Sequence, residues 1–388
     1  MNVAGLLLPT REGALEMWHP TGRTPIPPAA RAPTSRTVYA AVHVVADPLS
    51  PVDPVVRTVL DWDATMAFRH HVWSCGLAVA EAMDTAQRGM GLDWSSTREL
   101  IARTGVQARS VGGAWCAGVG TDQLPPGPTT IDDIVAAWRD QLEVVAAAGA
   151  VPMVMASRAL TATARGPEDY HRAYGKLLAD ASGPVLLHWL GEAFDPVLAG
   201  YWGRTDVRDA ATELVTLCRE HERVVSGVKV SVLDAEVEIQ LRRALPPSVS
   251  CYTGDDFSFP RLIAGDADGH SEALLGIFDP IAAVASAALA RLDHGDVDGF
   301  HGLLDPTVPL AREIFRPPTP HYKVGVVFLA YLAGHQRHMR MVAGLESARS
   351  VIHLAEVLRL AEAVGALPDP DLAVARMRPL LAVAGIDG

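Results

Sequence analysis

Lys229 is the residue of this chain whose type and position most clearly suggest chemistry. The chain has 33 basic residues, but its only lysines are Lys176, Lys229 and Lys323. An amine can lose its proton and act as a nucleophile, whereas a guanidinium cannot. Lys229 lies near the end of an apolar, β-branched run, residues 224–232, which predicts a buried strand. Burial lowers the pKa of an amine, so we expect a nucleophile near neutral pH; a strand-end lysine that merely reaches solvent is the alternative.

Four other side chains lie at or near the ends of predicted strands. His188 ends a strand over residues 185–189, where its pKa suits a general acid or base, although a core histidine fits the same pattern. Trp189 beside it can stack on a sugar ring or pack outward. Glu81 and Asp84 lie in or just after a strand over residues 77–82, where they can hold substrate hydroxyls or form a surface ion network.

Strand-like and helix-like segments alternate along the chain to position these groups. The predicted strands are residues 37–46, 77–82, 110–117, 151–156, 185–189, 224–232, 248–252 and 273–278. About eight short apolar strands, each followed by a helix, predict a (β/α)8 TIM barrel rather than an open sheet in a two-domain protein. We therefore expect an N-terminal arm over residues 1–36, the barrel over residues 37–285 and a helical C-terminal extension over residues 286–388.

Composition excludes several classes of function. The net charge of −12 argues against nucleic-acid binding, which needs a basic surface. The chain has no uncharged apolar run of 18 residues, so no membrane span is expected. The four cysteines form no paired spacing, which favours neither a disulfide framework nor a zinc motif and fits a reducing cytoplasm. No glycine-rich nucleotide-binding motif is present, so no nucleotide cofactor is expected.

Three stretches together resemble one known superfamily. The first is GVKVS at residues 227–231, the second is YTGDD at residues 252–256, and the third is the helical tail with PPTPHYK at residues 317–323. In order and spacing they are similar to the dihydrodipicolinate synthase and N-acetylneuraminate lyase superfamily of class I aldolases and lyases. The resemblance covers residues 140–335 and indicates a divergent, actinobacterial-type branch.

The resemblance implies roles for particular residues. In that superfamily a lysine on the sixth strand forms a Schiff base with the carbonyl of a 2-keto acid, and Lys229 matches that position. Gly254 would line the pocket beside the lysine, and Asp255 and Asp256 would lie on the following loop. The resemblance also implies that no organic cofactor or metal is needed and that the protein is a homodimer or homotetramer.

The chain also departs from the superfamily pattern in three places. The proton-relay tyrosine after the fourth strand is missing, and the sequence there is SRALT, with Arg158 in the nearest space. The carboxylate-binding loop after the second strand is replaced by EAMDTAQRG at residues 81–89, and the arginine after the fifth strand is absent. We therefore expect a proton shuttle other than tyrosine, and a keto acid outside the usual pyruvate-derived set or a sugar or polyol derivative as substrate.

The sequence thus predicts a Schiff-base lyase or aldolase acting on a small carbonyl compound. Lys229 would attack the carbonyl, and His188 or a carboxylate after the second strand would move protons. The residues expected to position the substrate are Glu81, Asp84, Arg158, Trp189, Gly254, Asp255 and Asp256. Two alternatives remain open: a metal-dependent sugar isomerase or epimerase that uses Glu81, Asp84, His188 and Asp255, and a barrel that binds a ligand without catalysis.

Overall fold

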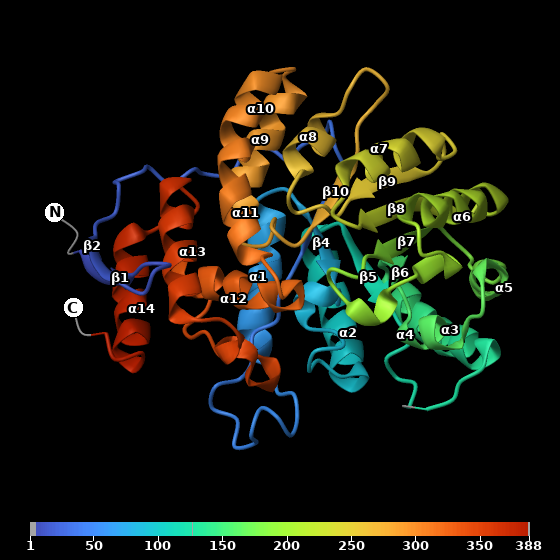
Figure 1. The fold of residues 1–388 in the computed structure, drawn as a ribbon, viewed down its shortest axis with the longest axis horizontal. Coiled ribbons are helices and arrows are strands. Elements are labelled where there is room, and N and C mark those ends of the chain that lie inside the picture. Colours follow the sequence, from blue (N-terminus) through green and yellow to red (C-terminus); the bar gives the residue numbers. More distant parts are fainter. Residues whose placement is uncertain (1–4, 126, 387–388) are drawn as a thin grey trace.

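The protein is a parallel β-barrel surrounded by helices, with a helical extension on one side (Figure 1). A computed structural model describes residues 5–125 and 127–386. Eight strands form the barrel, and the last pairs with the first to close it. In order they are β3 (Val38–Ala41), β4 (Ala78–Glu81), β5 (Trp115–Val119), β6 (Val151–Val154), β7 (Val185–Leu190), β8 (Val225–Ser231), β9 (Ser250–Thr253) and β10 (Glu272–Leu275). The predicted TIM barrel is confirmed, and the open sheet is wrong.

Helices follow the strands in the expected alternation. They are α1 (Trp62–Ser74), α2 (Trp94–Val111), α3 (Ile131–Ala148), α4 (Arg158–Thr163), α5 (Pro167–Leu178), α6 (Val207–Glu220), α7 (Ala235–Ala244) and α8 (Phe259–Ala264). Three short 3-10 turns lie in the loops: η1 (Asp84–Ala86), η2 (Pro196–Leu198) and η3 (Tyr201–Gly203). Local sequence sets several helix starts. At α3, for example, Thr130 and Asp133 satisfy each other's backbone N–H groups in a capping box.

One predicted strand begins later than its sequence suggested. Residues 110 and 111 belong to the end of α2, and β5 starts only at Trp115. The reason is Gly112, which ends the helix in the left-handed conformation with φ 64°, a backbone geometry that glycine adopts without steric cost.

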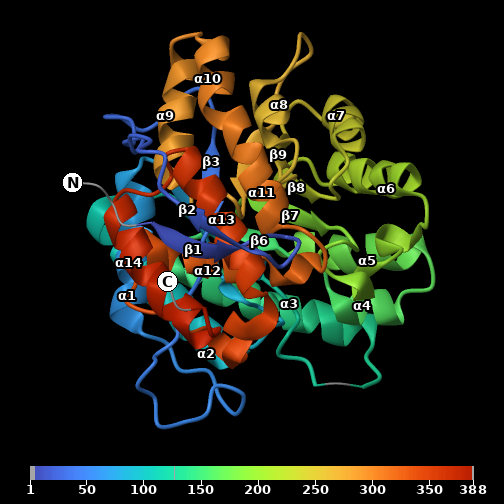
Figure 2. The same ribbon diagram turned by 60° about the vertical axis from the view of Figure 1, so that its left-hand side comes forward.

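The C-terminal extension packs against the barrel and against the N-terminal hairpin. Its elements are α9 (Ala282–Asp293), α10 (Val297–Leu304), η4 (Asp305–Thr307), α11 (Val308–Ile314), η5 (Thr319–His321), α12 (Tyr322–Leu332), η6 (Val342–Ala348), α13 (Val351–Ala363) and α14 (Pro370–Val383). The hairpin of β1 (Leu6–Pro9) and β2 (Leu15–Trp18) lies beside α13 and α14, as Figures 1 and 2 show from two directions. Arg359 of α13 donates hydrogen bonds to the backbone oxygen of Pro9. No helix in the described part of the chain is long and apolar enough to cross a membrane.

Alternation along each strand decides which side chains enter the barrel. Successive strand residues point to opposite faces, so β8 presents Gly227, Lys229 and Ser231 to the interior. A Cβ on Gly227 would lie 2.6 Å from the ring of Tyr252 and 2.9 Å from Leu186, two residues of the interior cluster. The intervening Val228 and Val230 pack into the outer layer beneath the helices. This alternation carries Lys229 into the barrel.

Candidate active site

Lys229 is a buried amine inside the upper part of the barrel. Its side chain comes from β8, and the residue is only 7% exposed. Burial lowers the pKa of this amine below its ordinary value, and the carboxylates of Asp84 and Asp256 oppose the shift in part. Desolvation wins because the protonated form loses more hydration than these two charges return. The uncharged, nucleophilic form of this amine is therefore easier to reach than it is for an exposed lysine.

Gly254, Ser231 and His188 surround the stem of this lysine. His188 on β7 stands opposite Lys229 in the strand register, and its Nε2 lies 3.1 Å from the Oγ of Ser231. A Cβ on Gly254 would lie 2.8 Å from the Cε of Lys229 and 2.1 Å from the Oγ of Ser231. Position 254 therefore has no room for a larger side chain, because the lysine and the serine occupy that space.

His188 is held in its neutral form. Burial, and secondarily the positive charge of Lys229, keep the pKa of this imidazole well below its usual range. Its Nδ1 is buried and has no hydrogen-bond partner among the described residues. A buried polar atom without a partner is costly unless a ligand or water meets it, so Nδ1 is available to a bound substrate.

The two aspartates after β9 have different environments. The Oδ1 of Asp255 accepts hydrogen bonds from the backbone N–H groups of Phe257 and Ser258, which shapes the loop. Asp256 lies in the field of Lys229, and its Oδ1 accepts a 2.9 Å hydrogen bond from the N–H of Ile277. Burial raises the pKa of Asp256 to about 7, so this carboxyl can both give and take a proton near neutral pH.

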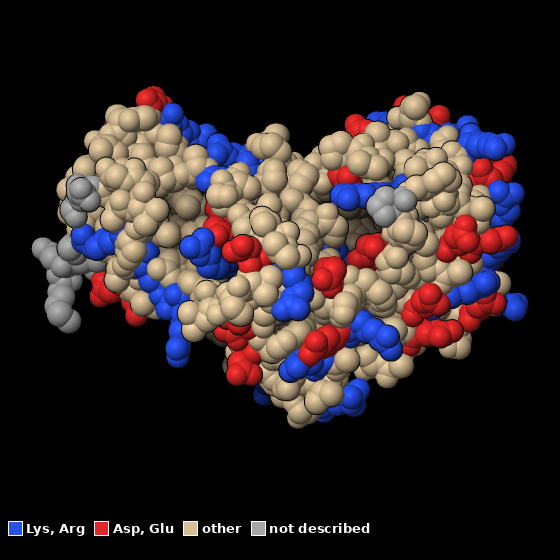
Figure 3. All heavy atoms as spheres, turned by 90° about the horizontal axis from the view of Figure 1, so that it is seen from below, with Lys and Arg blue, Asp and Glu red and all other residues tan. Residues whose placement is uncertain are grey.

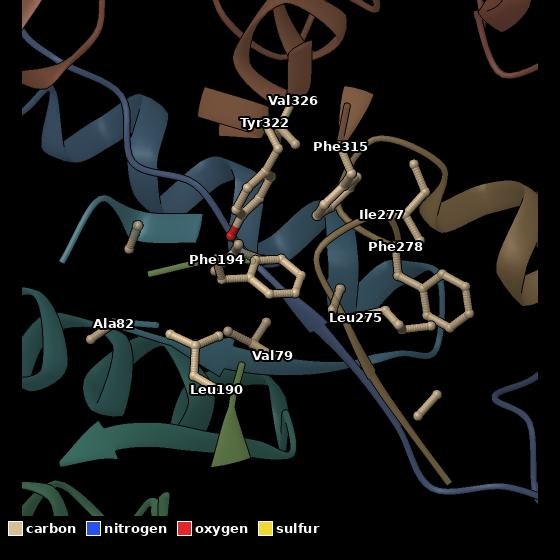
Figure 4. Packing of buried hydrophobic residues seen from close by; sticks show 14 of the residues in the cluster. Val79, Ala82, Leu190, Phe194, Leu275, Ile277, Phe278, Phe315, Tyr322 and Val326 are labelled. Atoms are coloured by element: carbon tan, nitrogen blue, oxygen red, sulfur yellow. The ribbon is translucent and has the colours of Figure 1, made fainter. Parts of the chain in front are cut away.

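A tyrosine that the sequence analysis did not select reaches the same region from the extension. Tyr322 begins α12 and is 3% exposed, and its hydroxyl lies 2.8 Å from the Oγ of Thr85 in the loop after β4. Its ring stacks on Phe315 at 4.3 Å between centroids and meets the edge of Phe194 (Figure 4). The only sequence signal was its place next to Lys323 after the proline-rich link, because the contact with Thr85 spans 237 residues.

Tyr322 and Lys229 share the same charged neighbours. Burial, followed by the negative charge of Asp84, holds the pKa of the Tyr322 hydroxyl well above its usual range, and Asp256 contributes in the same direction. The phenol is therefore protonated and available as a hydrogen-bond donor. We expected the proton shuttle to be a group other than tyrosine, but a tyrosine hydroxyl lies in this region, supplied by a different part of the chain.

Lys323 is a second buried amine near Asp84. It is 4% exposed, and its Nζ donates a 3.1 Å hydrogen bond to the backbone oxygen of Pro320. Burial lowers its pKa to about 8. Lys176 differs from both, since it lies on the surface and pairs with Asp132 at 2.6 Å.

A cleft of about 620 Å³ opens at the carboxyl ends of β4 to β7, and its link to these groups is Asp84, whose charge acts on Lys229, Tyr322 and Lys323. Asp84 lines the cleft, together with Met155, which follows the last residue of β6, and Leu190, which is the last residue of β7. Arg158, the first residue of α4, also lines it and pairs with Asp195 at 2.5 Å. The loop that carries Asp84 is conformationally unusual, because Ala82 adopts φ 54° although it is not glycine. Such backbone strain is concentrated at functional sites.

Comparison with protein families places this chain. The model of a family described as "Protein of unknown function (DUF993)" matches residues 6–386. The chain belongs to this family. No curated protein sequence matches it significantly.

Solved structures share the fold of this DUF993 member at low sequence identity. Dihydrodipicolinate synthase from Bacillus clausii is 15% identical, covers 85% of this chain and 98% of its own, and has a TM-score of 0.62. The enzyme from Aquifex aeolicus is 12% identical, with 90% and 98% covered and a TM-score of 0.60. YagE from E. coli K12, a prophage protein of the dihydrodipicolinic acid synthase family in complex with pyruvate, is 12% identical, with 91% and 99% covered and a TM-score of 0.63. The predicted resemblance in fold is confirmed.

Two residues expected at the site of this DUF993 member lie on the other face of their strands. Glu81 is fully buried in the outer layer, where its carboxylate accepts two 2.8 Å hydrogen bonds from Arg69 and one from Thr104. Trp189 packs outward in the same layer and is 4% exposed. Neither side chain reaches the cleft, so the expectation that they bind substrate is wrong.

The four residues suggested as metal ligands of an isomerase do not lie together in one site. Glu81 pairs with Arg69 outside the barrel, and the Oδ1 of Asp255 accepts hydrogen bonds from its own loop. That leaves Asp84 and His188, which are too few for a metal site. Among the described residues, no cluster of three or more histidine, cysteine, aspartate or glutamate side chains is arranged to hold a metal ion.

Proposed function

We propose that this protein is a Schiff-base-forming lyase or aldolase that acts on a small carbonyl compound, a keto acid or a sugar or polyol derivative. The supporting observation is the amine of Lys229, which projects into a closed barrel, has a lowered pKa and is acted on by the charge of Asp84, a residue that lines the cleft. The dihydrodipicolinate synthase-like fold supports the same class of reaction. We also propose that the protein acts in the cytoplasm as a homodimer or homotetramer, as the superfamily resemblance implies.

The first chemical step is attack of the uncharged Lys229 amine on the substrate carbonyl. The carbon–nitrogen bond forms, the carbonyl π electrons move to oxygen, the oxygen takes up a proton and the nitrogen releases one, which gives a neutral carbinolamine. A second proton allows that hydroxyl to leave as water, and an iminium remains. The iminium withdraws electrons from the neighbouring carbon–carbon or carbon–oxygen bond, so no organic cofactor is required for cleavage or condensation.

Three groups are placed to move these protons. Asp256 has a pKa of about 7, which suits an acid that must also act as a base. The Tyr322 hydroxyl, bonded to Thr85, can donate to the basic oxygen of the carbinolamine. His188 contributes through Nδ1 as a neutral hydrogen-bonding group rather than as a charged acid, because its pKa is held low. Asp84 and Arg158 line the cleft and would position the rest of the substrate.

Borohydride trapping tests this proposal directly. Protein incubated with glyoxylate, pyruvate, glyceraldehyde or dihydroxyacetone is reduced, and its adducts are located by peptide mass spectrometry. We expect an adduct on Lys229 with at least one of these carbonyl compounds and none at that position in Lys229→Arg. Lys176 and Lys323 are internal references, one exposed and one buried. If adducts form only on those two lysines, Lys229 is not the Schiff-base residue and the proposal fails.

A further inference from the structure

The cleft lined by Asp84, whose charge acts on Lys229, has one apolar wall. It is built where β6 leads into α4 and where β7 leads into η2, and it consists of Met155, Ala156, Ala159, Leu190, Val197 and Leu198. Val197 at the rim is 56% exposed, which is unusual for a large aliphatic side chain beside a cleft. Exposed apolar surface inside a concave site marks a place where an apolar ligand group is bound.

The two arginines that line the same cleft are each already paired with a carboxylate. Arg88 donates hydrogen bonds to both carboxylate oxygens of Asp122, and one of these, from Nε, is 3.1 Å long. Arg158 pairs with Asp195. Among the described lining residues, no arginine or lysine is left without a carboxylate partner to receive a phosphate or a second carboxylate. Acidic and basic side chains are also interspersed over the face seen from below in Figure 3.

We propose that the substrate carries an uncharged apolar group, aryl or branched alkyl, on the carbonyl compound that reacts with Lys229. This inference rests on the Schiff-base proposal and specifies its substrate class. The reacting carbonyl meets Lys229 near Asp84, and the apolar group lies along Met155, Ala159 and Leu198. A hydroxylated chain in that place would lose hydrogen bonds to water without replacing them on the apolar wall. Among the substrates considered above, the wall therefore favours a carbonyl compound with an apolar tail over a polyol.

A comparison of three aldehydes tests whether the apolar wall selects the substrate, and it does not require the natural substrate to be known. The probes are 3-methylbutanal, glyceraldehyde and succinic semialdehyde, which carry an apolar, a hydroxylated and an anionic group. Each is trapped with borohydride, and labelling of Lys229 is divided by labelling of surface Lys176, which corrects for the intrinsic reactivity of each aldehyde. We expect the ratio for 3-methylbutanal to exceed the ratios for the other two by about tenfold or more.

Variants of the wall provide the second measurement. Ala159→Glu and Val197→Glu place a carboxylate on the wall and should lower the 3-methylbutanal ratio about tenfold. Ala199→Glu is the matched control, because Ala199 is exposed in the same region but does not line the cleft. Using two wall variants guards against misfolding of either one, and Val197 is the more exposed position.

The possible failures are distinguishable. If no aldehyde labels Lys229, the Schiff-base proposal fails and the substrate class fails with it. If Lys229 is labelled but glyceraldehyde or succinic semialdehyde matches 3-methylbutanal, the Schiff-base proposal stands and the apolar substrate is refuted. The same refutation follows if neither wall variant changes the 3-methylbutanal ratio.

Discussion

Replacing Gly254 by alanine tests the geometry around Lys229 with a single methyl group. The new Cβ would lie 2.1 Å from the Oγ of Ser231 and 2.8 Å from the Cε of Lys229, whereas ordinary contacts begin at 3.4 Å. Ser231 would therefore have to withdraw by about 1.3 Å and the lysine stem by about 0.6 Å. The backbone oxygen of Val230, 2.9 Å away, blocks relief in a third direction.

The expected losses follow from these displacements. Overpacking of a closely packed interior costs about 1–3 kcal/mol of the free energy of unfolding. With an unfolding entropy of about 2.1 cal/mol/K per residue, that cost lowers Tm by about 1 to 4 °C in a chain of 388 residues. A misplacement of about 1 Å costs roughly a hundredfold in rate, so the smaller shift of the lysine stem costs about tenfold. Gly254→Ala should therefore fold but form the Lys229 adduct about ten times more slowly.

The assay is timed borohydride quenching, with melting curves recorded on the same samples. Gly227→Ala is the control, because its Cβ would also crowd the barrel interior, 2.6 Å from the ring of Tyr252, but it would not touch Lys229 among its nearest atoms. Both variants should lose stability, and only Gly254→Ala should lose most of its adduct rate. A stably folded Gly254→Ala protein that forms the adduct at the wild-type rate would refute the placement of Lys229 and Ser231 described here.

Three further predictions concern protons. Asp256 has a folded pKa of about 7 against an ordinary value of 3.8, so between these values the native state binds more protons than the unfolded state. Stability therefore falls as pH rises from about 4 to about 7. The Tm of Asp256→Asn should exceed that of wild type at pH 8 but not at pH 4. Tyr322→Phe and Tyr174→Phe each remove a buried hydrogen bond between two hydroxyls, and each should lower the free energy of unfolding by about 1 kcal/mol. Only Tyr322→Phe should also slow adduct formation in timed quenching, by about a hundredfold. The ring of His335 is tilted against that of His71 at 4.0 Å between centroids, and burial lowers its folded pKa to about 3. Stability is therefore lost as pH falls from 6.5 towards 3, and His335→Phe should unfold at lower pH when followed by circular dichroism.

Hydrophobic periodicity was sufficient to predict the barrel, but it did not show which side chains of each strand point into the barrel. The run around Lys229 has a two-residue alternation, and the GVKVS and YTGDD motifs brought Lys229 and Gly254 into contact as expected. Glu81 and Trp189 were misplaced because each lies one residue from an inward position. If His188 faces inward, then Trp189 must face outward, since adjacent strand residues point to opposite sides. The register that fixes this choice depends on pairing with neighbouring strands.

The contribution of the extension to the site could not be predicted from the sequence. Tyr322 reaches Thr85 because the start of α12 lies against the loop after β4, and no local pattern specifies a contact across 237 residues. The sequence predicted the helical extension that contains α12, but helical periodicity cannot state which barrel strand the first turn of that helix meets. Tertiary packing supplied that information, and the missing tyrosine after the fourth strand gave no indication of where another would come from.

Desolvation explains why Lys229 and Asp256 belong to one site. In water an amine and a carboxyl have pKa values far apart, and the pair exists as two opposite charges. Burial disfavours both charged forms, so it lowers the pKa of Lys229 and raises that of Asp256 to about 7. The two shifts bring the pKa values towards each other, which lowers the cost of moving a proton within the site. Burial thus shifts the two pKa values in opposite directions. A Schiff-base reaction needs this combination, because the amine must be uncharged to attack while the acid must still hold its proton.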